Sequence, residues 1–307
     1  MYKGFLELIW GLGLFLYGIN IMSEKTEKAF GDKLRLILGK TAKGKFSSIA
    51  TGTVITAVVQ SSTAVTVMLV SLIESGIVNL FQAVGIIMGA NMGTTVTSLL
   101  IAFNFSALSP VFIIFGASMK LFCKNERIKY SGEVILGLGL LFSGLDAMSE
   151  SFSFLRTNQA FLNLILSASG KVGGILSGIL MTVIIQSSSA TVGILQSLAS
   201  ENLVSLNDAI YIVLGQNIGT VLTVIIASVG RSHRAKQIAK IHLVFNIAGC
   251  LFFLPICSVL PVGEWLSLIS NPSLAISLFH IIFNIINTII LVPFYDRMAQ
   301  LPSKKRQ

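Results

Sequence analysis

Charged residues are scarce in this chain of 307 residues: Asp, Glu, Lys and Arg together make up only 11% of it. Hydrophobic residues reach 53% and the mean hydropathy is +0.83, whereas a soluble domain has about 25% charged residues. These values exclude an ordinary soluble domain and indicate an integral membrane protein. The excess of 22 Lys+Arg over 13 Asp+Glu lies between apolar runs, so it indicates membrane topology and not a nucleic-acid surface.

Residues that carry enzyme chemistry are also few. The sequence has only three cysteines and three histidines, and their spacing resembles no zinc site. It has no Ser/His/Asp or Cys/His cluster and no Walker or Rossmann glycine pattern. We therefore expect neither an enzyme nor a bound cofactor, and we expect Cys123, Cys250 and Cys257 to be packed, structural thiols.

The chain repeats itself at an offset of 126 residues without a gap. The matching segments are Gly11-Leu-Gly-Leu with Gly137-Leu-Gly-Leu, Gln60-Ser-Ser-Thr-Ala64 with Gln186-Ser-Ser-Ser-Ala190, and Gly89-Ala-Asn-Met-Gly-Thr94 with Gly215-Gln-Asn-Ile-Gly-Thr220. Three matches in one register are not chance, so the chain is an internally duplicated membrane protein. The duplication divides it into transmembrane repeat 1 (1–126), transmembrane repeat 2 (127–257), and an extra C-terminal helix with a basic cytoplasmic tail (258–307).

Apolar runs predict the same order of segments in both repeats. The order is a spanning helix (4–22 and 131–149), two short apolar halves (46–75 and 172–200), a long apolar segment (80–103 and 206–229) and a last helix (109–122 and 237–257). Each short half has about fifteen residues, fewer than the ~20 that a crossing needs, which is typical of a re-entrant hairpin. The polar Gly-x-Asn-x-Gly run predicts a broken helix in each long segment. We expect residues 24–45 to form a helix in the membrane interface. We expect residues 273–295 to form one more spanning helix.

Three crossings per repeat would invert the second repeat relative to the first. With the N-terminus outside and the C-terminus inside, all of the 22 Lys and Arg residues except Lys3, Arg156 and Lys171 lie on the inner side. The fold class is therefore an all-α polytopic membrane protein. It has two inverted-topology repeats, each with a re-entrant hairpin and a broken helix, plus one extra C-terminal helix.

Matched interruptions in two inverted repeats are the best sequence indication of a transport site. Both Gln-Ser-Ser breaks are rich in hydroxyls and amides, and they contain neither a carboxylate nor a basic side chain. We expect Ser62 and Ser188 to cap the second half-helix of each hairpin. Free backbone N–H groups and the positive end of the helix dipole would then bind an anion. Hydroxyl, amide and released carbonyl oxygens are ligands suited to Na⁺.

Helix packing remains an alternative explanation for some of these residues. Gly85, Gly89 and Gly93 have the spacing of close helix contacts, and a single Ser-Ser pair in a membrane is often an interhelical contact. The recurrence of the Gln-Ser-Ser and Gly-x-Asn-x-Gly residues in one register favours a substrate or ion site over helix packing. His242 and His280 open two similar motifs, His-Leu-Val-Phe-Asn246 and His-Ile-Ile-Phe-Asn284. For them the sequence supports a functional role and an interhelical hydrogen bond equally.

The doubled Gln-Ser-Ser and Gly-x-Asn-x-Gly-Thr motifs resemble the duplicated signature of the type II sodium–phosphate cotransporter family. The resemblance runs from residue 4 to about residue 256. It implies secondary transport of inorganic phosphate coupled to Na⁺ by alternating access, in the lipid bilayer of a bacterial cytoplasmic membrane. The matching substrate-binding residues are Gln60, Ser61, Ser62, Thr63, Gln186, Ser187, Ser188 and Ser189, and the ion-binding residues are Asn91, Thr94, Thr95, Asn217, Thr220 and Thr223.

Two other classes of function are compatible with the same sequence. A channel or passive pore for a small solute can also contain broken helices, but it does not drive its solute uphill. A non-transporting membrane receptor or assembly partner would tolerate alanine at Gln60 and Gln186 without losing a binding signal. The direction of flux and the oligomeric state stay open.

Overall fold

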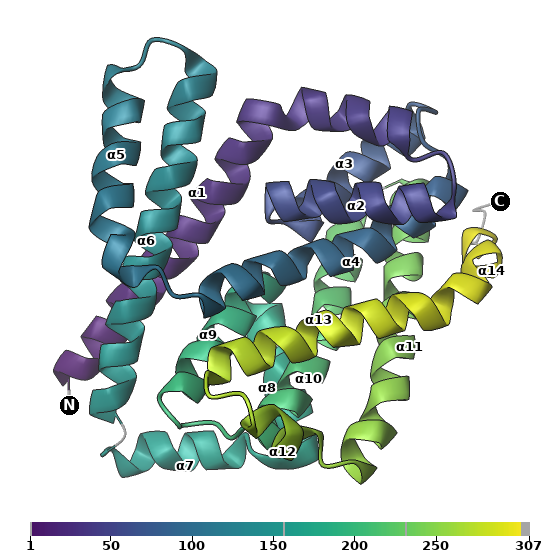
Figure 1. Cartoon of the computed structure of the whole chain (residues 1–307). Coiled ribbons are helices and arrows are strands. Elements are labelled where there is room, and N and C mark those ends of the chain that lie inside the picture. The colour runs from purple at the N-terminus through teal and green to yellow at the C-terminus, as the bar shows by residue number, and fades with distance from the viewer. Residues whose placement is uncertain (1, 156, 231, 302–307) are drawn as a thin grey trace.

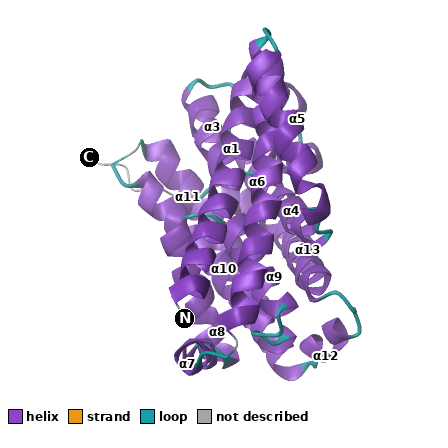
Figure 2. Cartoon of the chain, turned by 90° about the vertical axis from the view of Figure 1, so that its left-hand side faces the viewer, coloured by secondary structure: helices purple, strands orange, loops and turns teal. Residues whose placement is uncertain are grey.

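The computed structural model describes residues 2–155, 157–230 and 232–301, and within these ranges it consists of helices and loops without strands (Figures 1 and 2). Six described helices are long and apolar enough to cross a membrane, or up to seven if a bent helix pair is counted. The protein is therefore an all-α, multi-pass membrane protein, as the composition predicted. Arg156, Arg231 and the basic residues after position 301, which entered the charge argument, lie outside the described ranges.

Both repeats contain a long first helix, a pair of short helices, a long helix and a last helix in the same order, and repeat 2 has the additional short helix α7. Repeat 1 has α1 (Tyr2–Thr41), α2 (Lys45–Val59), α3 (Ser62–Glu74), α4 (Leu80–Ala102), the 3₁₀ turn η1 (Ser106–Leu108) and α5 (Ser109–Phe122). Repeat 2 has α6 (Glu126–Leu155), α7 (Gln159–Ser167), α8 (Gly170–Ile185), α9 (Ser188–Ser200), α10 (Leu206–Ser228) and α11 (His233–Val259). The chain ends with α12 (Val262–Ser267), α13 (Pro272–Leu291), η2 (Val292–Phe294) and α14 (Tyr295–Ala299). The two short apolar halves are helix pairs in both repeats, α2 with α3 and α8 with α9.

The helix expected at 24–45 is present as far as Thr41, but it continues α1 and is not an element of its own; its position in the membrane interface stays a prediction. Helix α1 continues through this stretch to Thr41, and Figure 1 shows it bending so that its last part runs across the top of the view. The physical reason is local. This stretch is rich in Lys and Leu and has no proline, and the Lys28 ammonium pairs with Glu24 one turn earlier at 2.6 Å. Nothing in the sequence therefore ends the helix at the membrane surface.

The broken helices expected in the long apolar segments are also wrong. Both α4 and α10 are continuous over 23 residues. Their glycines instead allow close contact with the first helix of each pair. A Cβ atom on Gly89 would lie 2.0 Å from the carbonyl oxygen of Ile49 in α2, and one on Gly215 would lie 2.1 Å from that of Ile175 in α8. Helix packing, the alternative left open above, explains these glycines.

The first helices of the two repeats, α1 and α6, pack against each other through glycines that the duplication relates. Gly11 contacts the backbone of Gly144, and Gly18 contacts that of Gly137. Because Gly144 is the repeat partner of Gly18 and Gly137 that of Gly11, the contacts are reciprocal and the two helices run antiparallel. A local two-fold axis produces such contacts. The inverted arrangement of the complete repeats stays a prediction.

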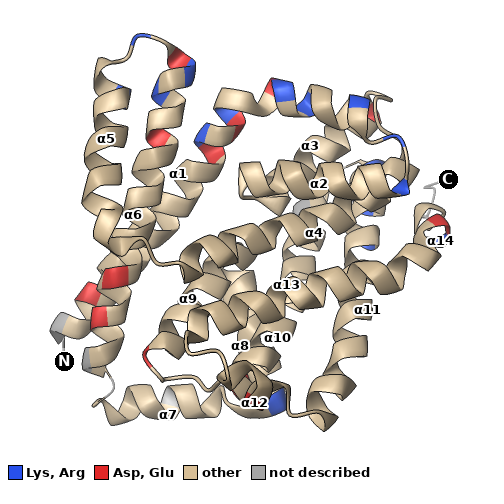
Figure 3. Ribbon diagram, viewed as in Figure 1, with Lys and Arg blue, Asp and Glu red and all other residues tan. Residues whose placement is uncertain are grey.

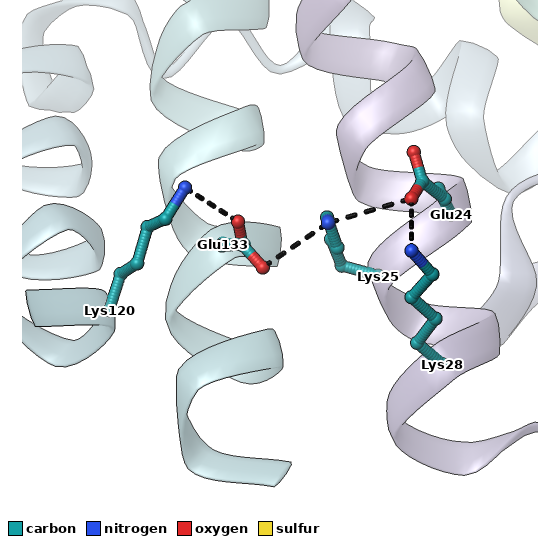
Figure 4. A network of polar contacts seen from close by, with 5 residues as sticks. All are labelled: Glu24, Lys25, Lys28, Lys120 and Glu133. Atoms are coloured by element: carbon teal, nitrogen blue, oxygen red, sulfur yellow. Dashed lines mark hydrogen bonds and ion pairs between the residues drawn. The ribbon is translucent and has the colours of Figure 1, made fainter. Parts of the chain in front are cut away.

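A chain of ion pairs joins α1, α5 and α6 (Figure 4). The Glu133 carboxylate, 8% exposed, lies 2.7 Å from the Lys120 ammonium and 3.5 Å from that of Lys25. Lys25 and Lys28 both also pair with Glu24. This network lies at the end of the molecule where Figure 3 shows many Lys and Arg residues, along the second half of α1 and the α5–α6 connection. The basic end of the protein is thus held together by its own few carboxylates.

Buried apolar side chains form three clusters. The first surrounds α2–α4 and includes Leu69 and Met88, the second joins α10, α11 and α13 around Phe253 and Phe283, and the third lies between α1 and α6 around Phe15. The described cysteines are all free thiols, as expected, and Cys250 and Cys257 are buried in the second cluster. The three clusters leave a polar region where the two helix pairs meet.

Candidate functional site

The two helix pairs break at glutamines that occupy the same place in each repeat. Gln60 ends α2 with φ 61° and ψ 18°, and Gln186 ends α8 with φ 58° and ψ 24°. Each backbone N–H donates to the carbonyl of the threonine four residues earlier, at 2.7 Å in both repeats. This left-handed conformation is uncommon for a residue other than glycine. It stops one helix and lets the next begin two residues later.

The serine that follows each glutamine caps the second helix. The Ser61 hydroxyl accepts from the backbone N–H of Ala64 at 3.1 Å, and the Ser187 hydroxyl accepts from that of Ala190 at 3.3 Å. The expectation that Ser62 and Ser188 are the caps is therefore wrong by one residue. A capping residue has extended backbone, and the left-handed glutamine leaves Ser61 and Ser187 extended, with φ −148° and −144°. The Ser62 and Ser188 hydroxyls are consequently not used for capping.

Both breaks line a single cavity of about 340 Å³. All eight hairpin residues expected at the substrate site belong to its wall: Gln60, Ser61, Ser62, Thr63, Gln186, Ser187, Ser188 and Ser189. Residues 126 positions apart in the sequence thus meet in one place. Ligand pockets usually measure about 300–1,000 Å³, so this cavity has the size for a small ligand with accompanying ions or water.

Among the described residues, no side chain in the wall of this cavity is ionisable. Its polarity comes from hydroxyls, amides and the first turns of α3 and α9, whose leading N–H groups have no acceptor within their own helix. Two helix N-termini at one cavity carry partial positive charge, which favours an anion without Lys or Arg. The same wall offers hydroxyl and amide oxygens that are suited to a hard cation.

Three further residues belong to this region and were missed as site residues. Asn20 and Ser23 of α1 line the cavity, and Thr97 of α4 donates its hydroxyl to Gln60 Oε1 at 2.5 Å. The repeat held a signal for two of them, because Ser23 matches Ser149 and Thr97 matches Thr223 in the same register. The sequence does not show that these α1 residues lie near the Gln-Ser-Ser breaks, because α1 reaches the cavity only when repeat 1 is folded.

Comparison with known proteins identifies the family. The sequence model of the Na⁺/Pi-cotransporter family matches residues 14–150 and again 154–280. The chain belongs to the Na⁺/Pi-cotransporter family. The resemblance read from the doubled motifs is thereby confirmed, and each of the two matches covers one copy of the Gln-Ser-Ser motif.

Similar proteins include bacterial and animal members. YjbB of Escherichia coli (strain K12), which carries a provisional name as an inorganic phosphate export protein, is 28% identical over 96% of this chain and 54% of its own length. The chain thus spans about half the length of YjbB. YqeW of Bacillus subtilis (strain 168), described as uncharacterized, is 30% identical over 94% of this chain and 93% of its own length.

Human sodium-dependent phosphate transport protein 2B is 36% identical over 45% of this chain and 21% of its own length. No solved structure matches the chain. The family is described as one of Na⁺/Pi cotransporters.

The residues expected to bind Na⁺ lie on α4 and α10 and do not line the 340 Å³ cavity. Their described hydrogen bonds stay within their own helices, from Asn91 to the Ile87 carbonyl and from Asn217 to the Val213 carbonyl, both at 2.9 Å. The hydroxyls of Thr94, Thr95, Thr220 and Thr223 likewise donate to carbonyls three or four residues earlier. Each of these side chains donates a hydrogen bond, and its oxygen keeps lone pairs that can bind a cation. Na⁺ binding at these residues stays a prediction.

The two histidine motifs lie buried on α11 and α13. Asn246 donates to the His242 carbonyl at 3.2 Å, and Asn284 donates to the His280 carbonyl at 2.9 Å. Neither nitrogen of the His242 ring has a partner among the described residues. The contact between these helices is made instead by Asn287, whose amide donates to the Phe245 carbonyl at 2.9 Å. Whether the two histidines have a functional role stays open.

Proposed function

We propose that this protein moves inorganic phosphate across a membrane, coupled to Na⁺, by alternating access. The observation that carries the proposal is the cavity in which both Gln-Ser-Ser breaks meet, one from each repeat. A site made of two equivalent half-sites at a repeat interface is the arrangement that secondary transporters use. Membership of the Na⁺/Pi-cotransporter family supports phosphate as the anion.

The chemistry of the wall supports an anion that arrives with cations. Phosphate carries more negative charge than two helix N-termini balance, since each is equivalent to roughly half a positive charge. No Lys or Arg lines the cavity, and burying one in a membrane would be costly. Na⁺ bound with the phosphate would supply the missing charge. Hydroxyl and amide oxygens of the hairpins, together with those of α4 and α10, are the ligands that we assign to it.

Orientation and direction are part of the proposal. Most of the described Lys and Arg residues gather at one end of the molecule (Figure 3), which the positive-inside rule places in the cytoplasm. The name of YjbB refers to export and that of human protein 2B to sodium-dependent transport. Both directions use one site in an alternating-access cycle, so the ion gradients decide the net flux.

Phosphate uptake into proteoliposomes tests the proposal. The purified protein is reconstituted, and radiolabelled phosphate is supplied with an inward Na⁺ gradient or with a gradient of a bulky organic cation. We expect accumulation above the external concentration only with Na⁺. Uptake that is indifferent to Na⁺ would remove the coupling, and equilibration without accumulation would assign the protein to the channels or passive pores.

A receptor or assembly partner is distinguished by substitution. Gln60→Ala and Gln186→Ala both change the wall of the cavity, so a transporter loses phosphate binding and flux. Preserved binding and function in both variants would favour the non-transporting class. Ser118→Ala serves as a control, because Ser118 is a partly exposed residue of α5, away from the cavity wall, whose hydroxyl bonds only to its own helix.

A further inference from the structure

A line of cavities leads from the Gln-Ser-Ser site toward the basic end of the protein. A second cavity of about 210 Å³ lies between α3 and α10, and it shares Thr63 with the first. A third cavity of about 640 Å³ shares Ser228 with the second and is lined by Lys236 and Lys240. In this structure the site therefore adjoins open space on the side where the Lys residues lie.

The duplication allows this open path to be compared with its counterpart in the other half. Val70 of α3 and Val224 of α10 both line the second cavity. Their repeat partners are Gln196 of α9 and Ser98 of α4. These two are in contact: Gln196 Nε2 lies 3.1 Å from both the carbonyl oxygen and the hydroxyl of Ser98. The interface that is open in one half is closed in the other.

Helix α13 completes this closure from outside the duplication. The Ser277 hydroxyl lies 2.6 Å from Gln196 Nε2 and 3.0 Å from the Ser98 hydroxyl, and the Gln196 amide also lies 3.1 Å from the Ser273 carbonyl. Gln196, Ser98 and Ser277 are each no more than 1% exposed. The three side chains thus form a buried polar junction of α4, α9 and α13.

Two neighbouring positions show the same difference between the halves. Ser23 and Ser71 line open cavities, whereas their repeat partners Ser149 and Ser197 are bonded to each other at 3.0 Å. In the same way Ser228 lines open space, whereas its partner Ala102 accepts a hydrogen bond from Asn271 at the start of α13. The closure is therefore a layer of several contacts and not one hydrogen bond.

We propose that the junction of Gln196, Ser98 and Ser277 is the gate that closes the site on the face opposite the Lys-rich end. It lies eight residues beyond Ser188 along α9, about 12 Å from the cavity at 1.5 Å per residue. When the site opens to that face, α9 separates from α4 and α13, and the path takes the form now seen between α3 and α10. This gate rests on the proposed alternating access, although its first test needs no transported substrate.

The chemistry of the junction fits a contact that opens and closes. Gln196 Oε1 is buried without a partner among the described residues, so closing leaves one acceptor unsatisfied. Water entering the opened path would hydrate that oxygen and the two serine hydroxyls. The free-energy difference between the closed and the open state is therefore smaller than it would be if every polar group of the closed junction had a partner. Valine at the equivalent positions of the open half offers no such contacts.

Thiol labelling tests the gate directly. In a background in which Cys123, Cys250 and Cys257 are replaced by Ala, Ser23→Cys places a reporter in the wall of the cavity. We expect a membrane-impermeant thiol reagent to label this reporter rapidly from the Lys-rich face and slowly from the opposite face. Gln196→Val, which installs the residue of the open half, should raise labelling from the opposite face about tenfold, equivalent to about 1.4 kcal/mol.

Two further variants separate a gate from a general loss of packing. Ser277→Ala removes a hydroxyl of the junction and should also raise labelling from the opposite face. Thr288→Val removes another buried hydroxyl of α13, which bonds only to the Asn284 carbonyl of its own helix, and it should leave the labelling rate unchanged. Unchanged labelling in both Gln196→Val and Ser277→Ala would show a fixed structural contact and overturn the proposal.

A reversible crosslink supplies the second measurement. The Ser98 and Ser277 hydroxyls are 3.0 Å apart, so Ser98→Cys combined with Ser277→Cys should form a disulfide under oxidation. We expect the crosslink to stop labelling from the opposite face and to stop phosphate flux until a reductant is added, while either single variant is insensitive to oxidation. Flux that continues through the crosslinked protein would overturn the gate. No flux in the parent protein, with labelling as expected, would instead overturn phosphate transport.

Discussion

Gln60 and Gln186 hold the same left-handed backbone conformation, with φ 61° and 58°, and both line one cavity. Such a conformation costs a residue with a side chain roughly 1–3 kcal/mol and persists where the surrounding structure imposes it. It occurs twice at equivalent positions, and each time it is followed by a capping serine and a free helix start. The pair therefore places two helix N-termini at one site, which is the basis of the predictions for anion binding.

Capping and ligand-binding serines should respond differently to substitution. Ser62→Ala and Ser188→Ala should each weaken phosphate binding by roughly ten- to a hundredfold with little loss of stability, because the bound anion loses a hydrogen-bond partner. Ser61→Ala and Ser187→Ala should each lower stability by about 1 kcal/mol through the lost cap. Phosphate titration and thermal unfolding of the purified variants measure the two effects. Equal losses of binding in all four variants with no change in stability would contradict the assignment.

Phosphate affinity should rise steeply with Na⁺ concentration. The cavity wall has no basic side chain, so co-bound Na⁺ supplies the positive charge that the anion needs. Dissociation constants for phosphate are measured at several Na⁺ concentrations, with ionic strength held constant by a bulky organic cation. An affinity that stays flat across this series would mean that the anion is held in another way.

Glycines at helix contacts should be far more sensitive than a glycine without neighbours. Gly89→Ala would place a Cβ atom 2.0 Å from the Ile49 carbonyl oxygen, so α2 and α4 must move apart and stability should fall markedly. Gly13→Ala is the matched change in α1, where nothing lies within 4 Å of the added atom. There the better helix propensity of alanine should stabilise the protein, by up to about 1 kcal/mol. Thermal unfolding in detergent compares the two, and similar effects would contradict the close α2–α4 contact.

Loop accessibility should show the orientation. Single cysteines introduced by Lys43→Cys and Lys124→Cys, in a background without native cysteines, should be protected from an impermeant thiol reagent in intact cells. A cysteine introduced by Ser270→Cys, in the exposed connection before α13, should be labelled. Labelling at Lys124 that equals labelling at Ser270 would contradict the placement of the basic end in the cytoplasm.

The sequence by itself determined the membrane class, the duplication and the hairpin residues. Composition decides the first, because 53% hydrophobic and 11% charged residues cannot form a soluble surface. A fixed register of 126 residues reveals the second, and two identical polar breaks in apolar surroundings identify the hairpins. These signals are local or periodic, so they can be read without knowing which helices touch.

Only the tertiary structure decided how the same residues are used. Gly89 and Asn91 look like a helix break in the sequence, but α4 stays continuous because the glycine faces the backbone of α2. The cap shifts from Ser62 to Ser61 because the preceding glutamine takes a left-handed backbone. Asn20 joins the site, and Gln196 meets Ser98 and Ser277, only when helices distant in sequence pack together. Such contacts depend on three-dimensional distances, and the order of residues along one chain does not contain those distances explicitly.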